Sequence, residues 1–178
     1  MTDPRFDPSY DPLAEGTAAA DLVEALRVRG QTVATAESLT AGLMSATIAG
    51  VPGASAVLRG GLVVYATDAK AGIGGVDPAV LAADGPVAAS TARQLALAAA
   101  RNLDATWGVA LTGVAGPDPQ DGHEPGTVFC GLVRRRSLSD EVFAHAWELS
   151  GSRWEIRLTS ARRALQELLA AVLADGAR

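Results

Sequence analysis

The sequence has little of several residue types, and each shortage excludes a class of protein. It contains one cysteine, Cys130, so neither an internal disulfide nor a cysteine-rich metal site can form. Its two histidines, His123 and His145, are too few for a histidine-rich metal site. Aromatic residues make up only 4% of the chain, so alanine, valine and leucine must build the core. No apolar run approaches the roughly 18 residues that a membrane-spanning helix needs, and we therefore expect no membrane partner.

Positive charge is also scarce, and nearly all of it is arginine. The formal net charge of -5 argues against nucleic acid as a partner, because phosphate binding relies on clustered positive charge. The one basic cluster, Arg134-Arg135-Arg136, follows a predicted strand, and we favour a solvated hairpin turn there. Lys70 is the only lysine among the 15 basic residues. A GC-rich genome would explain this bias. Lysine, unlike arginine, can lose its proton when it is desolvated, so Lys70 is also a candidate for chemistry.

The first 16 residues are rich in proline and aspartate and show no periodicity. We expect a flexible N-terminal tail over residues 1–16, and nothing in it resembles a signal peptide. Residues 17–178 are long enough to form one domain with its own core. These features predict a cytoplasmic protein.

Helix and strand patterns alternate through the first half of this domain, and a pair of strands comes late. Apolar periodicity predicts helices over residues 18–29, 88–102 and 152–174, with short helices around Lys70 and after Asp77-Pro78. Another helix is predicted to follow residues 37–40, to pass through Leu43, Met44 and Ile48, and to end at Gly50. Strands are predicted over residues 32–36, 57–65, 106–111, 127–133 and 141–149. We expect residues 57–65 to be buried, and Thr67 or Asp68 to cap the helix that carries Lys70. The order predicts an α/β fold, a three-layer α/β/α sandwich with a mixed sheet.

Small hydroxyl side chains mark the junction between the first strand and the second helix. Ser38 and Thr40 lie there, where free backbone N–H groups at a helix N-terminus favour an anion or an oxyanion. A simpler alternative is that one of them only caps the helix and that Glu37 complements the helix dipole. Spacing alone leaves both interpretations open.

Two further strand ends carry candidate site residues. The strand over residues 57–65 ends on Tyr65, and Lys70 follows about one helical turn later, where a surface ion pair with Asp68 is the default expectation. The segment from Thr112 to Asp118 is rich in glycine, so its backbone can approach a ligand and its N–H groups can hold phosphate. A plain glycine-rich turn explains it equally well. A phosphate-binding P-loop and a complete dinucleotide fingerprint are both absent from the sequence.

Together these segments resemble the C-terminal domain of the CinA family of competence- and damage-inducible proteins. The resemblance runs from about residue 18 to residue 174 and rests on motifs at residues 35–42, 59–70, 112–118 and 125–128. Stand-alone members of the family are similar to nicotinamide mononucleotide deamidases, which release ammonia and nicotinate mononucleotide. The resemblance therefore implies an amidohydrolase of pyridine-nucleotide salvage and NAD metabolism. It also implies a small-molecule nucleotide as partner, a homo-oligomeric state, and no metal or cofactor.

The resemblance also implies the role of each site residue. Ser38 would be the nucleophile and Lys70 its base, with Tyr65 nearby, and the backbone N–H groups after Ser38 would form the oxyanion hole. A lysine that is neutral near pH 7 needs its pKa to fall by ~3 units from ~10.4. The substrate phosphate is expected on the loop from Thr112 to Gly116. Arg153 either assists there or is an ordinary surface residue in the first turn of its helix, and both interpretations stay open. The implied substrate-binding residues are Glu37, Thr40, Gly42, Gly60, Thr112, Gly113, Gly116 and Arg153.

Three positions depart from the family pattern. Ala41 replaces the first glycine of a Gly-Gly pair, Thr112 replaces a serine, and Val87-Ala88-Ala89 stands where the family has Val-Ser-Glu. These departures concern the pocket more than the fold. Two alternatives therefore stay open, an amidase for another small carboxamide and a nucleotide-binding or regulatory module without catalysis.

Overall fold

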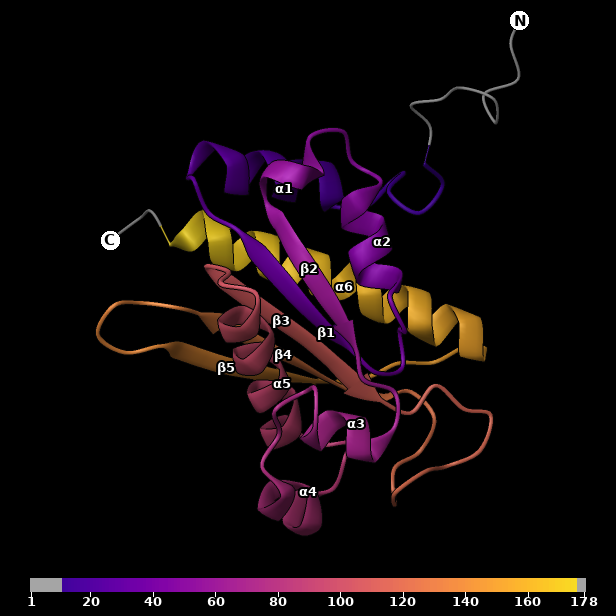
Figure 1. The fold of residues 1–178 in the computed structure, drawn as a ribbon. Coiled ribbons are helices and arrows are strands. Elements are labelled where there is room, and N and C mark those ends of the chain that lie inside the picture. Colours follow the sequence, from indigo (N-terminus) through magenta and orange to yellow (C-terminus); the bar gives the residue numbers. More distant parts are fainter. Residues whose placement is uncertain (1–10, 176–178) are drawn as a thin grey trace, which may run out of the picture.

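A mixed five-stranded sheet forms the middle layer of the computed structural model, which describes residues 11–175 (Figure 1). The strand order across the sheet is β2-β1-β3-β4-β5. The first three strands of the chain run parallel: β1 (Val33–Glu37), β2 (Leu58–Val63) and β3 (Trp107–Gly113). The last two pair antiparallel: β4 (Thr127–Arg134) and β5 (Glu141–Glu148). The predicted α/β sandwich with a mixed sheet is confirmed.

Helices cover both faces of the sheet (Figure 1). One face carries α1 (Ala19–Val28), α2 (Leu43–Ala49) and α6 (Arg153–Ala174), which also contact one another. The other face carries α3 (Thr67–Ala71), α4 (Pro78–Asp84) and α5 (Ala89–Asn102). A short 3-10 helix, η2 (Ala54–Ala56), precedes β2. Within residues 11–175, no helix has the length and apolar character needed to cross a membrane.

The helix α5 packs very closely on the sheet, in a core that contains few aromatic residues. A Cβ added at Gly108 would overlap the carbonyl oxygen of Ala96, and one at Gly131 would overlap that of Ala92. Both carbonyls belong to α5, so its backbone nearly touches the strands. Small residues on both sides make this approach possible, and a core of alanine, valine and leucine fills the space.

Two local expectations around β2 are wrong. The strand is not buried but lies at the edge of the sheet, paired only with β1, and its side chains alternate between half-buried and exposed. Val63 and Tyr65 are each 55% exposed. Neither Thr67 nor Asp68 caps the helix after it, because Ala66 occupies the N-cap position without a side-chain bond. In the sheet order, β1 pairs with β2 on one side and with β3 on the other, which leaves β2 at the edge of the sheet.

The arginine cluster opens the β4–β5 hairpin as predicted, but all three of its side chains form ion pairs. Arg134 and Arg136 both bind the carboxylate of Asp175 at the end of α6, at 3.0 and 2.8 Å. Arg135 pairs with Asp104, which precedes β3, at 2.9 Å. The start of the hairpin lies beside these two acidic residues, so the three guanidinium groups tie it to the end of α6 and to the α5–β3 connection.

The expected N-terminal tail falls partly outside the described residues, since residues 1–10 are not among them. Residues 12–16 form consecutive turns, in which the Asp11 carbonyl accepts from the N–H groups of Ala14 and Glu15 at 3.1 Å. The Asp11 side chain lies against Gly50 at the end of α2, where a Cβ would overlap it. This part of the segment is therefore packed on the domain.

Candidate active site

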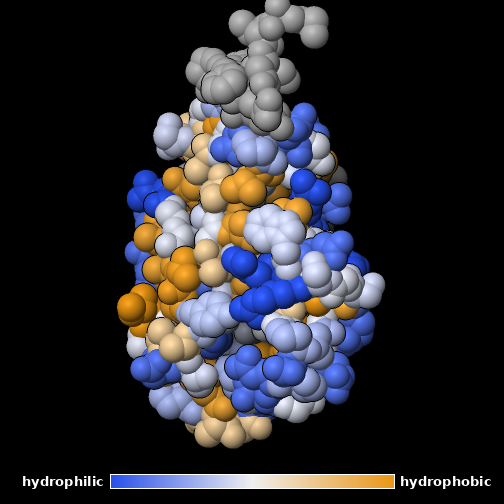
Figure 2. All heavy atoms as spheres, turned by 90° about the vertical axis from the view of Figure 1, so that its right-hand side faces the viewer, coloured by the Kyte–Doolittle hydropathy of each residue, from blue (hydrophilic) through white to orange (hydrophobic). Residues whose placement is uncertain are grey.

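A pocket lies at the carboxyl ends of β1, β2 and β3, the edge where open α/β sheets bind ligands. Figure 2 looks onto this side of the molecule and shows hydrophilic side chains gathered around its centre. The pocket brings together six of the predicted site residues: Ser38, Tyr65, Lys70, Gly113, Gly116 and Arg153. They come from four separate segments of the chain, which the fold places beside one another at this edge of the sheet.

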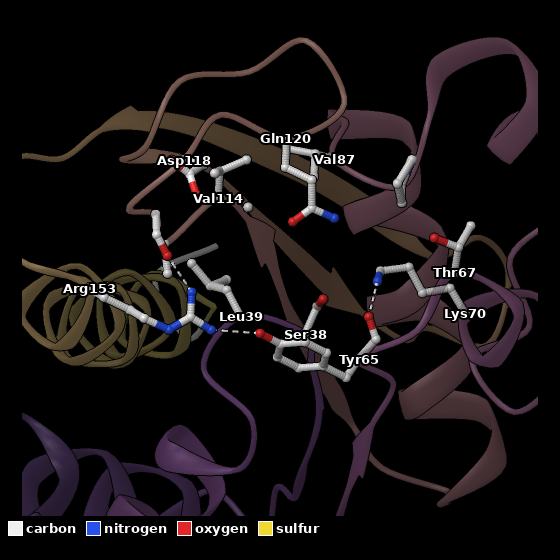
Figure 3. A pocket seen from close by; sticks show the side chains of 14 residues that line it. Ser38, Leu39, Tyr65, Thr67, Lys70, Val87, Val114, Asp118, Gln120 and Arg153 are labelled. Atoms are coloured by element: carbon white, nitrogen blue, oxygen red, sulfur yellow. Dashed lines mark hydrogen bonds between the residues drawn. The ribbon is translucent and has the colours of Figure 1, made fainter.

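Ser38 is the first residue after β1. Its N–H donates to the carbonyl of Leu111 on β3 at 2.9 Å, which extends the strand pairing to the serine. The side chain is only 6% exposed and points into the pocket (Figure 3). The serine does not sit at the helix N-terminus, because a turn over residues 38–42 intervenes and Gly42 is the N-cap of α2. Ser38 is therefore not a capping residue.

The turn after Ser38 leaves two backbone donors without acceptors. The N–H of Ala41 donates to the Ser38 carbonyl and that of Leu43 to the Thr40 carbonyl. Among the described residues, the N–H groups of Leu39 and Thr40 have no acceptor. Unpaired N–H groups beside a reactive serine are suited to binding a developing oxyanion. This arrangement fits the oxyanion hole expected after Ser38.

Lys70 lies in the last turn of α3, and its side chain enters the pocket from the opposite side to Arg153 (Figure 3). The residue is 3% exposed, and its Nζ donates to the carbonyl of Tyr65 at 3.0 Å. Burial lowers the pKa of Lys70, and the negative charge of Asp121 opposes this effect in part. The default surface pairing with Asp68 is wrong, because that carboxylate accepts from the N–H of Ala69 instead.

Ser38 and Lys70 share the pocket without a direct hydrogen bond. In the part of the chain that the structure describes, the one hydrogen bond of Lys70 Nζ is to the Tyr65 carbonyl, and Ser38 Oγ has none. The predicted contact between the two groups is thus not formed in this state. Catalytic hydrogen bonds often tighten only when substrate is bound.

Arg153 closes one side of the pocket. It is the first residue of α6, directly after Ser152, whose side chain forms a capping box with Glu155. Its guanidinium donates to the hydroxyl of Tyr65 at 2.7 Å and to the carbonyl of Gly116. One arginine therefore joins α6, the end of the β2 segment and the loop after β3 (Figure 3). This position differs from that of an ordinary surface residue in a first helical turn.

Glu37 does not face the pocket. Its carboxylate accepts from the N–H groups of Gly42 and Met44, each at 3.0 Å, and from that of Ser45 at 2.8 Å. The Ser45 hydroxyl also donates to it at 2.6 Å. The carboxylate thus neutralises the N-terminus of α2, so the helix-dipole interpretation is right and binding of substrate by this side chain is not supported.

Four other predicted binding residues also lie away from the pocket lining. Thr112 is buried and its hydroxyl donates to the carbonyl of Pro86 at 2.7 Å. Thr40 is buried too, and its hydroxyl has no partner among the residues that the structure covers. Gly60 faces Leu103, and Gly42 supplies the positive φ of +97° that the N-cap of α2 requires. None of these four residues lines the cavity, although the backbone N–H of Thr40 follows directly after Leu39, which does.

A comparison of the sequence with protein families gives a match to the CinA C-terminal domain over residues 15–172. The chain belongs to this family. It is 43% identical over 147 residues to a CinA-like protein of Frankia casuarinae, an alignment that covers 83% of this chain and 32% of that protein. The chain spans about a third of the length of the curated relatives it matches. What those longer proteins do as a whole is therefore not assigned to it.

Solved structures of the CinA superfamily share the fold. The crystal structure of the competence/damage inducible protein CihA from Agrobacterium tumefaciens matches with a TM-score of 0.82 and 34% identity, covering 90% of this chain and 96% of that one. A superfamily protein from Klebsiella pneumoniae matches with a TM-score of 0.84 over 92% of this chain and 99% of that one. Its identity is 22%, so this likeness concerns the fold alone.

The departures from the CinA pattern lie largely outside the pocket. Ala41 has a positive φ of +51°, is exposed and does not line the cavity, so its methyl group does not narrow the site. Ala88 is the N-cap of α5 and Ala89 its first residue, and of the three-residue stretch only Val87 reaches the pocket. The side chains of Ala41, Ala88 and Ala89 therefore contribute nothing to the lining of the pocket.

Sequence reasoning missed three polar residues that line the pocket, Thr67, Asp118 and Gln120. The Gln120 amide lies above Ser38 in Figure 3, held by a two-residue turn in which Gln120 and His123 exchange backbone hydrogen bonds at 3.0 Å. Asp121 and Gly122, at the centre of this turn, both have positive φ. An Asp-Gly pair is the sequence signal for such a turn, and it could have identified the hairpin but not its position over the site.

Proposed function

We propose that this protein hydrolyses the carboxamide of nicotinamide mononucleotide to nicotinate mononucleotide and ammonia. The observation that carries the proposal is the presence in one pocket of the Ser38 hydroxyl and a lysine with a pKa that burial lowers. A serine with a lysine as base is a known arrangement for attack on an amide carbonyl. The choice of a nicotinamide nucleotide as substrate comes from the family to which the chain belongs.

The proposed reaction proceeds through an acyl-enzyme. Neutral Lys70 takes the proton of Ser38 while Oγ attacks the carboxamide carbon, and the N–H groups of Leu39 and Thr40 hold the resulting oxyanion. The Lys70 ammonium then gives the proton to the amide nitrogen, the C–N bond breaks and ammonia leaves. Water attacks the acyl group with Lys70 again as base, which releases the carboxylate and restores Ser38. A neutral amine keeps two N–H bonds and a lone pair, so Lys70 can hold the Tyr65 carbonyl throughout.

The nucleotide phosphate is assigned in this proposal to the loop after β3 and to Arg153. Among the described residues the N–H groups of Ala115 and Gly116 have no acceptor, and both residues line the pocket. Arg153 uses two of its five N–H groups on Tyr65 and Gly116, so three remain for an anion. The carboxylate of Asp118, on the same loop, suits hydroxyl groups of the ribose better than phosphate.

The test is ammonia release from nicotinamide mononucleotide by the purified protein, with Ser38→Ala as the control for contaminating activity. Release by the wild-type protein and none by the variant is the expected result. Equal turnover of the phosphate-free nucleoside would favour an amidase for another small carboxamide. Thermal stabilisation by the nucleotide without ammonia release would favour a binding or regulatory module.

The same proposal places the protein in the cytoplasm as a homo-oligomer that needs no metal or cofactor. Val63 and Trp154, 55% and 50% exposed, offer apolar surface to a second copy. Light scattering after gel filtration measures the oligomeric state directly, and the expected mass exceeds that of one 18.1 kDa chain.

Replacing Asp121 with asparagine should move the acidic limb of the pH–rate profile to lower pH. The negative charge of Asp121 raises the pKa of Lys70 against the larger effect of burial, so its removal lets that pKa fall further. Since the base must be neutral, activity then persists into more acidic solution. Asparagine tolerates the positive φ of +52° at this position, so the turn is preserved.

The measurement is kcat/KM for ammonia release against pH. Asp21→Asn, which removes the same charge from the exposed side of α1, is the matched control and should leave the limb in place. An unchanged limb in the Asp121 variant would contradict the assignment of the titrating base to Lys70.

A further inference from the structure

A second arginine of α6 holds the turn that follows Ser38. Arg157 lies one helical turn after Arg153, and its Nε donates to the Leu39 carbonyl at 2.9 Å. Its Nη2 donates to the Thr40 carbonyl at 3.1 Å. One guanidinium therefore binds two successive carbonyl groups of the turn, from a helix more than 110 residues away in the sequence.

The bond to the Leu39 carbonyl determines where the free N–H group of Thr40 points. In a trans peptide the N–H lies opposite to the carbonyl of the preceding residue. With the Leu39 carbonyl directed at Arg157, the N–H of Thr40 must point away from it, and this N–H has no acceptor among the residues described. The Thr40 carbonyl is held in the same way, and the next N–H, of Ala41, donates to the Ser38 carbonyl.

Other contacts hold the turn at its two ends, where the N–H of Ser38 donates to Leu111 and that of Gly42 to Glu37. The turn's own backbone bonds are long, 3.1 Å from Ala41 to Ser38 and 3.2 Å from Leu43 to Thr40. Ala41 occupies the left-handed region at φ +51°, which an L-residue adopts at a cost. The buried hydroxyl of Thr40 makes no hydrogen bond within residues 11–175. Among the described residues, the bonds from Arg157 are the only side-chain hydrogen bonds to the middle of the turn, residues 39–41.

The charged guanidinium of Arg157 is engaged by these two carbonyl groups. Within the described part of the chain it forms no ion pair, and its guanidinium lies 5.9 Å from the centre of the Trp154 ring. Hydrogen bonds from an ionised donor are stronger than those between neutral groups. The contact is thus a strong, directional one made to the backbone beside the serine.

We propose that Arg157 is a positioning residue for the oxyanion hole. It holds the peptide group between Leu39 and Thr40 so that the N–H of Thr40, beside that of Leu39, meets the oxygen that becomes negative when Ser38 attacks. It touches neither the substrate nor the serine side chain. The proposal rests on Ser38 being the nucleophile of the proposed function.

The test uses an alkyl fluorophosphonate, which phosphorylates an activated serine with loss of fluoride and whose phosphoryl oxygen needs the same N–H donors. The rate of labelling at Ser38, followed by intact mass, is compared in the wild type, Arg157→Met, Arg157→Lys and Arg162→Met. Methionine keeps the apolar stem of Arg157 and removes its donors. Arg162 is exposed on the same helix and supplies the matched control.

We expect labelling to slow by about 10- to 100-fold in Arg157→Met, since one lost oxyanion donor costs roughly 10²–10³ in rate. Arg157→Lys should lie between, because an ammonium cannot bind both carbonyls as a planar guanidinium does. Arg162→Met should label like the wild type. The midpoint of thermal unfolding and the stabilisation by nicotinamide mononucleotide should stay as in the wild type for all variants.

Labelling of Arg157→Met at the wild-type rate would overturn the proposal. So would a slower rate that accompanies loss of nucleotide binding, which would mark a general structural role. If Arg157→Met does not fold, the labelling rate of Arg157→Lys is the test. A wild-type rate in that variant would overturn the positioning role of Arg157. A wild-type protein that is not labelled at Ser38 would instead contradict the nucleophile of the proposed function, and the role of Arg157 would be rejected with it.

Discussion

Arginine in place of Lys70 should abolish ammonia release although it keeps the positive charge and most of the side-chain length. Ser38 can pass its proton only to a neutral base, and a guanidinium stays protonated at every pH at which the protein is folded. Loss of a general base costs about 10²–10⁴ in rate. We therefore expect kcat to fall by roughly 10³ in Lys70→Arg and in Lys70→Met, with little change in KM.

Initial rates of ammonia release against nucleotide concentration provide the measurement. Arg93→Lys, at an exposed position of α5, is the control for exchange between the two basic residues and should have wild-type rates. Activity of Lys70→Arg above about a tenth of the wild type would show that this residue is not the base, since a tenfold loss lies below the range for general base catalysis.

The pH dependence of the wild-type rate is a second test of Lys70 as the base. Desolvation lowers the pKa of Lys70, and only the charge of Asp121 raises it. The rate should therefore be low while Lys70 is protonated, rise as pH passes through the lowered pKa, and reach its plateau below the ~10.4 of an ordinary lysine. Loss of this limb in Lys70→Met would assign it to Lys70.

Alanine in place of Glu37 should lower the free energy of unfolding by about 3–5 kcal/mol, although the residue adjoins Ser38. The side chain is 1% exposed, and its carboxylate is the acceptor for three N–H groups at the start of α2 and for the Ser45 hydroxyl. Without it these donors stay buried without a partner, at about 1–3 kcal/mol each before the structure relaxes. Urea unfolding with an unchanged m-value measures the loss.

Two variants make this prediction specific. Glu37→Gln keeps the volume and one acceptor oxygen but turns an NH₂ group toward N–H donors, so we expect a loss of about 2 kcal/mol. Glu24→Ala removes a carboxylate that pairs with Arg27 while both side chains are more than half exposed, and should change stability by less than about 0.5 kcal/mol. A Glu37→Ala protein as stable as the wild type would mean that this carboxylate does not support α2.

Local patterns were enough to predict most of the elements. Gly30 follows α1 with a positive φ of +60°, Asp77 caps α4 ahead of Pro78, and Ser152 with Glu155 opens α6. Each signal acts through neighbours in the chain, so its meaning does not depend on the rest of the fold. The alternation of such elements, with a late strand pair, predicted the sandwich that the structure confirms.

Contacts between distant segments account for the predictions that failed. The arginines after β4 look solvated until Asp175 and Asp104 are placed beside them. The strand β2 looks buried until the order of the sheet leaves it at the edge. Neither the partners nor the order can be deduced from short-range periodicity, because both depend on how the chain packs as a whole.

The features of the site also divide into those that the sequence predicted and those that only the tertiary structure decided. The sequence predicted, through motifs that resemble those of the CinA family, that Ser38, Tyr65 and Lys70 belong to one centre, and it left the place of Arg153 open. The tertiary structure decided what each side chain does: it buries Lys70, which lowers its pKa, and turns Glu37 toward α2 rather than the pocket. Burial and side-chain direction arise only when separate elements meet, since desolvation and hydrogen bonding depend on the atoms that surround a group and not on its neighbours in the chain.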